Sequence, residues 1–231
     1  MTQHRFLEAW SPFLQDGKNI LHMTLSSRLS KTFDQSVLAS REAMEIFPER
    51  TVITIDTTSA SLGQGMLALK AAQAKKDGKS VDETAEILRE TAKRIHVWLM
   101  ADDLHHLKRG GRISGAKAVV GTMLNVKPIL TVGSNGRLAP VSKARGRNKA
   151  MVYFTEMMEK YEFVKEETFY IAHTDDIELA KQLAEMVTEK FGITDIIIHD
   201  VGPIIGAHVG PGAVAMFFFG NDRRVNMDDM D

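Results

Sequence analysis

The chain has 231 residues, 44% of them hydrophobic and 26% charged, which is enough for one large α/β domain or two smaller ones. Its formal net charge of −1 gives no electrostatic attraction to nucleic acid or to an anionic membrane, so neither is an expected partner. The chain has no cysteine, which excludes disulfide bonds and thiolate metal sites, and no apolar run is long enough to span a bilayer. No secretory signal is visible, so we expect a cytoplasmic protein without membrane insertion.

The first ninety residues alternate between helical and strand patterns. Phe6, Trp10 and Leu14 recur at helical spacing, and Ser80 followed by Glu83 is the pattern of a capping box. The expected elements are, in order, a helix around 6–14, a strand over 21–25, a helix to about residue 46, a strand over 52–55, and helices over 62–76 and 81–94.

The rest of the chain continues the alternation. Asn135-Gly136 predicts a type I′ hairpin turn. The expected elements are a strand over 96–100, a short helix over 103–108, a helix over 116–124, strands over 128–132 and 137–141, a helix over 148–161, a strand over 169–173, a helix over 177–191, strands over 195–201 and 214–220, and a mobile polar tail from residue 221.

This alternation predicts an α/β fold of two lobes with mainly parallel sheets. The first lobe covers 1–95, to which part of 200–215 could be added, and the second lobe covers 96–231 with the polar tail. Binding sites of parallel sheets lie beyond the carboxyl ends of the strands. Ser26-Ser27 and Asp56 follow such strand ends, which marks them as candidate functional residues.

Two glycine-rich runs are the most distinctive segments. In the first, Arg109 and Arg112 flank a Gly-Gly pair, and backbone N–H groups and guanidinium groups together could hold an anion or a partner that carries one. The second run, over 202–212, places His208 between glycines and prolines that restrict the backbone. For the first run alone, a turn that links two helices is the simpler interpretation, but two such runs in one chain are hard to attribute to turn chemistry.

Other polar groups allow both a structural and a functional interpretation. The hydroxyls of Ser26 and Ser27 could bind a carboxylate or phosphate, or cap the following helix. Arg145 and Arg147 stand at a predicted helix start, where the helix dipole disfavours cations, so they indicate either an external partner or a solvated helix end. Histidine spacing gives no metal site. The glycine runs match no nucleotide-binding fingerprint.

Taken together and in this order, several segments resemble the DegV family of bacterial fatty-acid-binding proteins. They cover nearly the whole chain and are Thr24-Leu25-Ser26-Ser27-Arg28-Leu29-Ser30, residues 55–65, Arg109-Gly110-Gly111-Arg112-Ile113-Ser114-Gly115, Lys143-Ala144-Arg145-Gly146-Arg147, and residues 202–212. The resemblance implies two lobes that hold one long-chain fatty acid between them, with no catalysis by this chain and no cofactor or metal. In the better understood members, a separate fatty-acid kinase phosphorylates the bound carboxylate with ATP.

Carried over by position, the resemblance assigns Ser27 to a hydrogen bond with the fatty-acid carboxylate and places His208 near the same head group. Our further candidates for contacts with the head group or the kinase are Ser26, Arg109, Arg112, Arg145 and Arg147.

The chain departs from the family pattern in two places. Lys31 stands where the family usually has glycine, and the sequence begins at the opening helix, without the preceding strand and the Thr-Ser pair. We therefore expect an incomplete first lobe, which a second copy in a homodimer could complete. Two alternatives to the carrier stay open: a hydrolase or transferase of acyl groups that uses Ser27 and His208, and an interaction module that binds no lipid.

Overall fold

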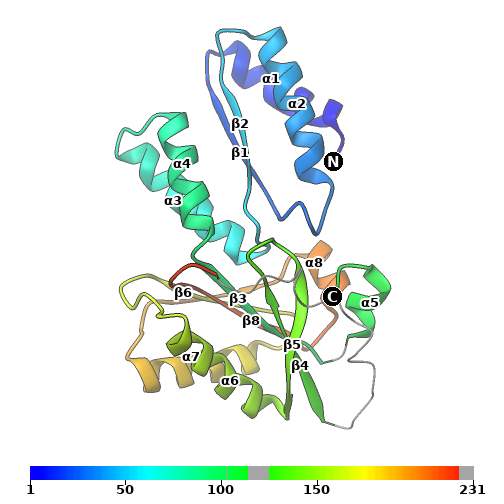
Figure 1. The fold of residues 1–231 in the computed structure, drawn as a ribbon, viewed down its shortest axis with the longest axis vertical. Coiled ribbons are helices and arrows are strands. Elements are labelled where there is room, and N and C mark those ends of the chain that lie inside the picture. The colour runs from blue at the N-terminus through cyan, green and yellow to red at the C-terminus, as the bar shows by residue number, and fades with distance from the viewer. Residues whose placement is uncertain (103, 114–124, 224–231) are drawn as a thin grey trace. The chain divides into compact units, whose positions relative to one another are not determined.

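The computed structural model describes residues 1–102, 104–113 and 125–223. The chain divides into two compact units (Figure 1). Unit 1 comprises Met1–Ala60 and Gln64–Lys93, and unit 2 comprises Ser61–Gly63 and Arg94–Asp231. Each unit combines helices with a sheet, which confirms the predicted α/β class.

Unit 1 is built on a parallel pair of strands. β1 (Ile20–Thr24) pairs with β2 (Val52–Asp56) so that Thr24 lies opposite Asp56. The helices are α1 (Gln3–Gln15), α2 (Thr32–Ile46), α3 (Leu62–Lys76, whose first two residues are assigned to unit 2) and α4 (Val81–Ala92). The core forms where α2 packs on α1 and on β2, through Phe6, Trp10, Leu14, Ala39, Ala43 and Val52.

The start of α4 confirms the predicted capping box. The Ser80 hydroxyl accepts a hydrogen bond from the Glu83 N–H at 3.1 Å, and the Glu83 carboxylate accepts one from the Ser80 N–H at 2.8 Å. These hydrogen bonds, with the nearby Lys79 charge, lower the pKa of the Glu83 carboxyl. Two N–H groups that an uncapped helix leaves unpaired are therefore satisfied locally.

Unit 2 contains, among its described residues, a six-stranded sheet in the order β5-β4-β3-β8-β6-β7. Its strands are β3 (Ile95–Met100), β4 (Val126–Val132), β5 (Leu138–Arg145), β6 (Phe169–His173), β7 (Ile196–Asp200) and β8 (Val214–Phe219), and its helices are α5 (His105–Gly110), α6 (Arg147–Lys160), α7 (Ile177–Phe191) and α8 (Pro203–Val209).

The strand directions correct the expectation of mainly parallel sheets. The β1–β2 pair is parallel, but among the described strands of the larger sheet the β6–β7 pair alone is parallel and the other pairings are antiparallel. A parallel pair needs a crossover, which α7 supplies between β6 and β7, whereas β4 and β5 are joined by a hairpin. β8 enters the middle of the sheet antiparallel to both of its neighbours.

The hairpin between β4 and β5 also differs from its prediction. Gly136 has a φ of 79°, but Asn135 does not have the positive φ that a type I′ turn needs. The Gly136 N–H donates to the Gly133 carbonyl and the Gly133 N–H to the Arg137 carbonyl, both at 2.9 Å. The loop is therefore a longer turn that ends on a left-handed glycine.

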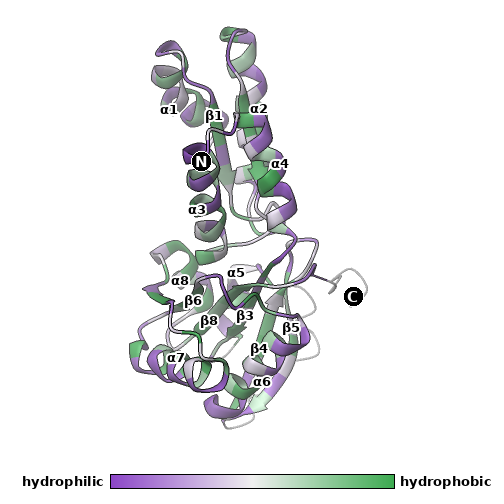
Figure 2. Cartoon of the chain, turned by 90° about the vertical axis from the view of Figure 1, so that its left-hand side faces the viewer, coloured by the Kyte–Doolittle hydropathy of each residue, from purple (hydrophilic) through white to green (hydrophobic). Residues whose placement is uncertain are grey.

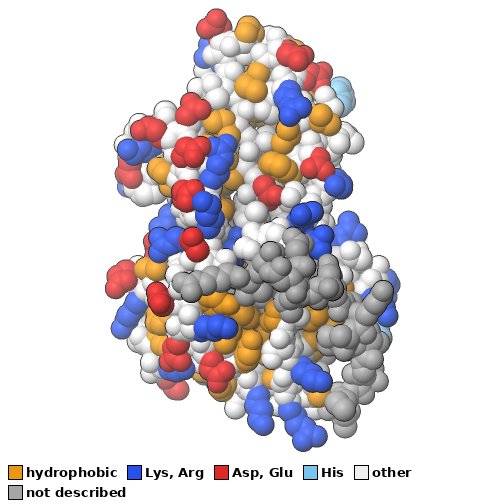
Figure 3. Space-filling view, in the orientation of Figure 1, with side chains coloured by type: hydrophobic (Ala, Val, Ile, Leu, Met, Phe, Trp, Pro, Cys, Tyr) orange, Lys and Arg blue, Asp and Glu red, His pale blue; other side chains and the backbone are white. Residues whose placement is uncertain are grey.

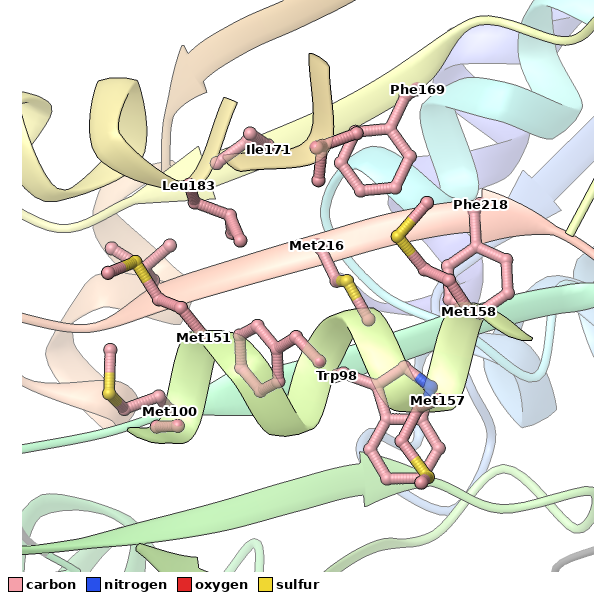
Figure 4. Close-up of a cluster of buried hydrophobic side chains, with 14 of the residues drawn as sticks. Trp98, Met100, Met151, Met157, Met158, Phe169, Ile171, Leu183, Met216 and Phe218 are labelled. Atoms are coloured by element: carbon pink, nitrogen blue, oxygen red, sulfur yellow. The ribbon is translucent and has the colours of Figure 1, made fainter. Parts of the chain in front are cut away.

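Both faces of the six-stranded sheet are apolar. On one face, Trp98, Met100 and Met216 pack beneath α6 and α7 against Met151, Met158 and Leu183 (Figure 4). Side chains alternate between faces along a strand, so the neighbouring residues point to the other face. These are also buried: Val97, Leu99, Tyr170, Ala172, Ala215, Phe217 and Phe219. Figure 2 shows much of this sheet as hydrophobic.

Some sequence predictions lie outside the described residues, and one concerns a loop that proved to be a helix. The helix expected over 116–124, the end of the first glycine-rich motif at Ser114-Gly115, and most of the expected tail lie outside the described residues. The second glycine-rich run, interpreted as a loop, contains a seven-residue helix, α8, which begins with Pro203 and ends at Gly210.

Candidate functional site

In unit 1, the polar residues after β1 and β2 meet around Asp56. The Asp56 carboxylate accepts hydrogen bonds from the Ser27 N–H (3.3 and 3.2 Å to its two oxygens) and from the Thr58 N–H (2.8 Å). Thr58 has a φ of 45°, a conformation that costs a β-branched residue free energy. Asp56 therefore holds both strand-end turns in place, a role beyond the local capping that the sequence favoured.

The two candidate serines have different surroundings. Ser26 is fully buried, its N–H donates to the Ser59 carbonyl and its hydroxyl accepts from the Arg28 N–H, so its polar groups serve the turn. Ser27 is half-buried, and its hydroxyl has no hydrogen-bond partner among the described residues. Its N–H is fixed while its hydroxyl remains available, which suits Ser27 to binding a ligand oxygen.

In unit 2, the candidate residues gather at the edge of the six-stranded sheet that is formed by the ends of its strands. β3 and β6 end at this edge and β8 begins there, because Val214 lies opposite both Met100 and His173. The short helix α5 follows β3, and the short helix α8 precedes β8. The two helices pack against each other. Figures 1 and 2 show α8 on the side of the sheet opposite α6 and α7.

The packing of α5 on α8 brings the two glycine-rich runs together. The His208 imidazole lies against Gly110, and the His106 imidazole lies against Gly210, so closely that a Cβ on either glycine would clash with the ring. His208 is half-buried and has no hydrogen-bond partner among the described residues. The missing side chains of Gly110 and Gly210 thus leave room for the two rings where they lie, which a simple linking turn would not need.

Three of the four candidate arginines are exposed. Arg109 contacts the His106 Nδ1 atom at 3.0 Å through Nη2, and Arg112 donates to the Gly110 carbonyl at 2.7 Å, so both belong to the α5 region. Arg145 is exposed at the end of β5. In Figure 3, basic and acidic side chains are interspersed over the visible face of unit 1.

Arg147, the fourth arginine, has partners within unit 2. Its guanidinium binds Asp102 at 3.1 Å and Asp176 at 2.8 Å, and Lys127 binds Asp102 at 2.7 Å. Burial by itself would raise the pKa of the Asp102 carboxyl, but the hydrogen bonds and charges of Lys127 and Arg147 lower it below its ordinary value. The cation at the start of α6 is thus balanced by carboxylates, which explains why the helix dipole does not exclude it.

Asp102 and Arg147 also cover Gly212 in the second glycine-rich run. A Cβ on Gly212 would approach the Asp102 carboxylate to 2.8 Å and the Arg147 guanidinium to 3.2 Å, and Gly212 has a φ of 72°. The sequence did not single out Asp102, nor Thr174, whose hydroxyl binds this run as well. Thr174 directly follows β6 and Asp102 comes two residues after the end of β3, and this position near a strand end is the signal that could have identified them.

Over the described ranges, no group of three or more histidines and carboxylates could hold a metal ion. Within those ranges there is also no helix with the length and apolar character needed to cross a membrane.

Comparisons with known proteins agree with these features. The family model described as "Uncharacterised protein, DegV family" matches residues 1–221. A DegV domain-containing protein of Clostridium perfringens is 41% identical over 225 residues, which are 97% of this chain and 77% of that protein. A structure from Thermus thermophilus, titled as fatty acid binding of a DegV family protein, has a TM-score of 0.83 and 29% identity, and covers 95% of this chain and 77% of that chain.

A third match is the Streptococcus pneumoniae Fatty Acid Kinase (Fak) B3 protein loaded with linoleic acid, with a TM-score of 0.85 and 22% identity over 96% of this chain and 77% of that chain. At this identity the match shows a shared fold. The family match over nearly the whole length, together with the identity to the Clostridium perfringens protein, shows that this chain belongs to the DegV family.

Proposed function

We propose that this chain binds a long-chain fatty acid and that Ser27 and His208 contact its carboxylate. Relatives support the ligand class, since the Thermus thermophilus protein is described as a fatty-acid-binding member of the family. The observation that carries the proposal is the His208 imidazole, held half-buried against Gly110 without a hydrogen-bond partner among the described residues. An oriented imidazole of this kind can donate to a carboxylate oxygen.

The head group and the hydrocarbon need different surroundings. A buried carboxylate is costly unless donors satisfy it, and the Ser27 hydroxyl and the His208 ring supply two. The hydrocarbon needs apolar surroundings, and the buried apolar sheet face that carries Val97, Leu99 and Phe217 is our candidate for them. Burial of about 15 methylenes at ~0.8 kcal/mol each contributes roughly 12 kcal/mol. Association costs about 4–15 kcal/mol, so useful affinity requires an apolar site that is already formed.

The second part of the proposal is that the chain is a cytoplasmic carrier without catalysis of its own, which presents the carboxylate to a separate ATP-dependent fatty-acid kinase. A protein of the same fold bears the name Fatty Acid Kinase (Fak) B3, which supports this role. The exposed side chains of Arg109, Arg112 and Arg145 are candidates for contacts with the kinase or the head group, because guanidinium groups pair well with carboxylates and phosphates.

Isothermal titration with oleic acid tests the two head-group residues. We expect Ser27→Ala and His208→Gln each to weaken binding about tenfold, which corresponds to one lost hydrogen bond to a charged group. Ser11→Ala, which removes a hydroxyl that donates within α1, and His199→Gln, on the exposed strand β7, are the matched controls. Variants that bind as tightly as wild type would contradict the assignment, and hydrolysis of an acyl ester that Ser27→Ala abolishes would contradict the non-catalytic role.

A further inference from the structure

Thr174 is joined to the end of the second glycine-rich run by a concentrated set of hydrogen bonds. It directly follows β6 and is 9% exposed. Its hydroxyl donates to the Gly210 carbonyl at 2.6 Å and accepts from the Ala213 N–H at 2.9 Å. Its backbone N–H donates to the Ala213 carbonyl at 2.9 Å, and its carbonyl accepts from the Gly212 N–H at 2.8 Å. One side chain thus bridges the two ends of segment 210–213.

This segment is where α8 ends. The Gly210 N–H donates to the Gly206 carbonyl at 2.8 Å and closes the last turn of the helix, while the methyl group of Thr174 faces Gly206. His208 lies between these two glycines in the chain, and its ring rests on Gly110 of α5. The half of α8 that carries His208 is therefore held by Thr174 through hydrogen bonds and by α5 through packing.

The segment needs such a restraint because its backbone is intrinsically free. Gly210 has a φ of 84° and Gly212 a φ of 72°. Glycine adopts positive and negative φ about equally readily, so these two residues do not by themselves hold the backbone in this conformation. A glycine-rich segment gains conformational freedom when its hydrogen bonds are lost. The hydroxyl of Thr174 binds the carbonyl of Gly210 and the N–H of Ala213, which directly follows Gly212. These two hydrogen bonds restrict the backbone of the segment.

We propose that Thr174 is a positioning residue for His208: its hydroxyl fixes the end of α8 and thereby the place of the imidazole. Thr174 acts through the backbone, with no contact to the ligand required. The proposal rests on the proposed function only where it predicts ligand affinity, because the position of His208 is a property of the ligand-free protein as well.

The first experiment uses the ligand-free protein and three variants. Thr174→Val removes the hydroxyl and keeps the shape, Thr174→Ser keeps the hydroxyl, and Thr155→Val removes a buried hydroxyl that donates within α6. We expect Thr174→Val to speed exchange of the Ala213 amide hydrogen about tenfold and to shift the NMR signals of the His208 ring, with protection of the sheet amides retained. Thr174→Ser and Thr155→Val should leave both readouts at their wild-type values.

The second experiment measures oleic acid affinity in a double-mutant cycle. If Thr174 acts through His208, Thr174→Val weakens binding about tenfold, and adding it to His208→Gln causes little further loss. Losses that multiply in the double variant would overturn the proposal, as would a wild-type Ala213 exchange rate and His208 signal in Thr174→Val. If wild-type protein bound no oleic acid, the proposed function would fail, and the exchange experiment would still decide the role of Thr174.

Discussion

The imidazole of His208 occupies the space that a side chain on Gly110 would need. This contact explains why two glycine-rich runs far apart in the sequence are both present: one supplies the ring and the other the bare backbone on which it rests. The reciprocal contact of His106 with Gly210 repeats the arrangement. α5 and α8 are short, so their mutual packing rather than their own helix propensity must stabilise them.

Gly110→Ala should displace His208. The added Cβ would overlap the ring, and overpacking of this kind costs about 1–3 kcal/mol. We expect a lower free energy of unfolding in urea and shifted NMR signals of the His208 ring. Gly65→Ala is the control, because nothing lies within 4 Å of its Cβ position in α3, and alanine should stabilise that helix by up to about 1 kcal/mol. Equal effects of the two substitutions would contradict the packing described.

Asp56→Ala should loosen the turn that carries Ser27. The carboxylate accepts from the N–H groups of Ser27 and Thr58, and its removal leaves both without this acceptor, at a cost of about 1–3 kcal/mol. We expect faster amide hydrogen exchange at Ser27 and Thr58, measured by NMR. Asp77→Ala removes an exposed carboxylate that accepts a hydrogen bond from Gln73, and it should leave the exchange rates of both amides unchanged. Unchanged exchange in Asp56→Ala would show that other contacts hold the turn.

Arg147→Met should raise the pKa of the Asp102 carboxyl. The charges of Lys127 and Arg147 oppose the effect of burial there, so loss of one cation shifts the balance toward the protonated form. Carbon-13 NMR titration of the Asp102 carboxyl measures the change. Arg89→Met breaks an exposed pair with Glu86 within α4 and should leave the Asp102 titration as in wild type. If the pKa of Asp102 in Arg147→Met equals that of wild type, Lys127 alone keeps it low.

The stability of the protein should fall in mild acid because of His96. Burial lowers the pKa of His96 from 6.5 to about 4, against the opposing hydrogen bond of its Nε2 with the Asn221 carbonyl. Between these pH values the unfolded chain binds a proton that the folded chain does not. The stability present above pH 6.5 is therefore lost as the pH falls toward 4, by at most about 3 kcal/mol.

Urea unfolding between pH 8 and 4 (about one measurement per half unit) tests this dependence, with His96→Phe as the comparison. Phenylalanine can keep the stacking on Phe218 and the tilted ring contact with Tyr161 but cannot bind a proton. Burial also lowers the pKa of His22, which adds to the acid sensitivity with the same sign. The variant should thus show a shallower slope than wild type, and equal slopes would rule out His96 as the source.

Local signals in the sequence were sufficient for most elements. The strand over 169–173 and the helix over 177–191 have the predicted bounds, because the Asp176 side chain accepts from the Leu179 N–H at one helix end and left-handed Gly192 terminates the other. α8 was not predicted, since its glycines and proline favour a loop and its packing on α5 decides the outcome. The antiparallel directions in the six-stranded sheet depend on long-range pairing, which local patterns do not encode.

The candidate site was predictable to a similar degree. The family resemblance selected Ser27, which follows β1, and His208, which lies in α8, and neither side chain has a hydrogen-bond partner among the described residues. The strand pattern marked Asp56 as a candidate, but the sequence did not show its role or that of Thr174, because both depend on hydrogen bonds to segments about 30 to 40 residues away. Arg147 looked like a candidate for an external partner because its partners Asp102 and Asp176 are 45 and 29 residues away along the chain.

Native mass spectrometry of the purified protein, followed by denaturing extraction and lipid analysis, tests the central claim most directly. We predict a stoichiometric mass excess that extracts as a fatty acid of roughly 16 to 18 carbons, in keeping with a ligand largely buried by the protein. A mass equal to that of the chain alone, unchanged after incubation with oleic acid, would contradict the account.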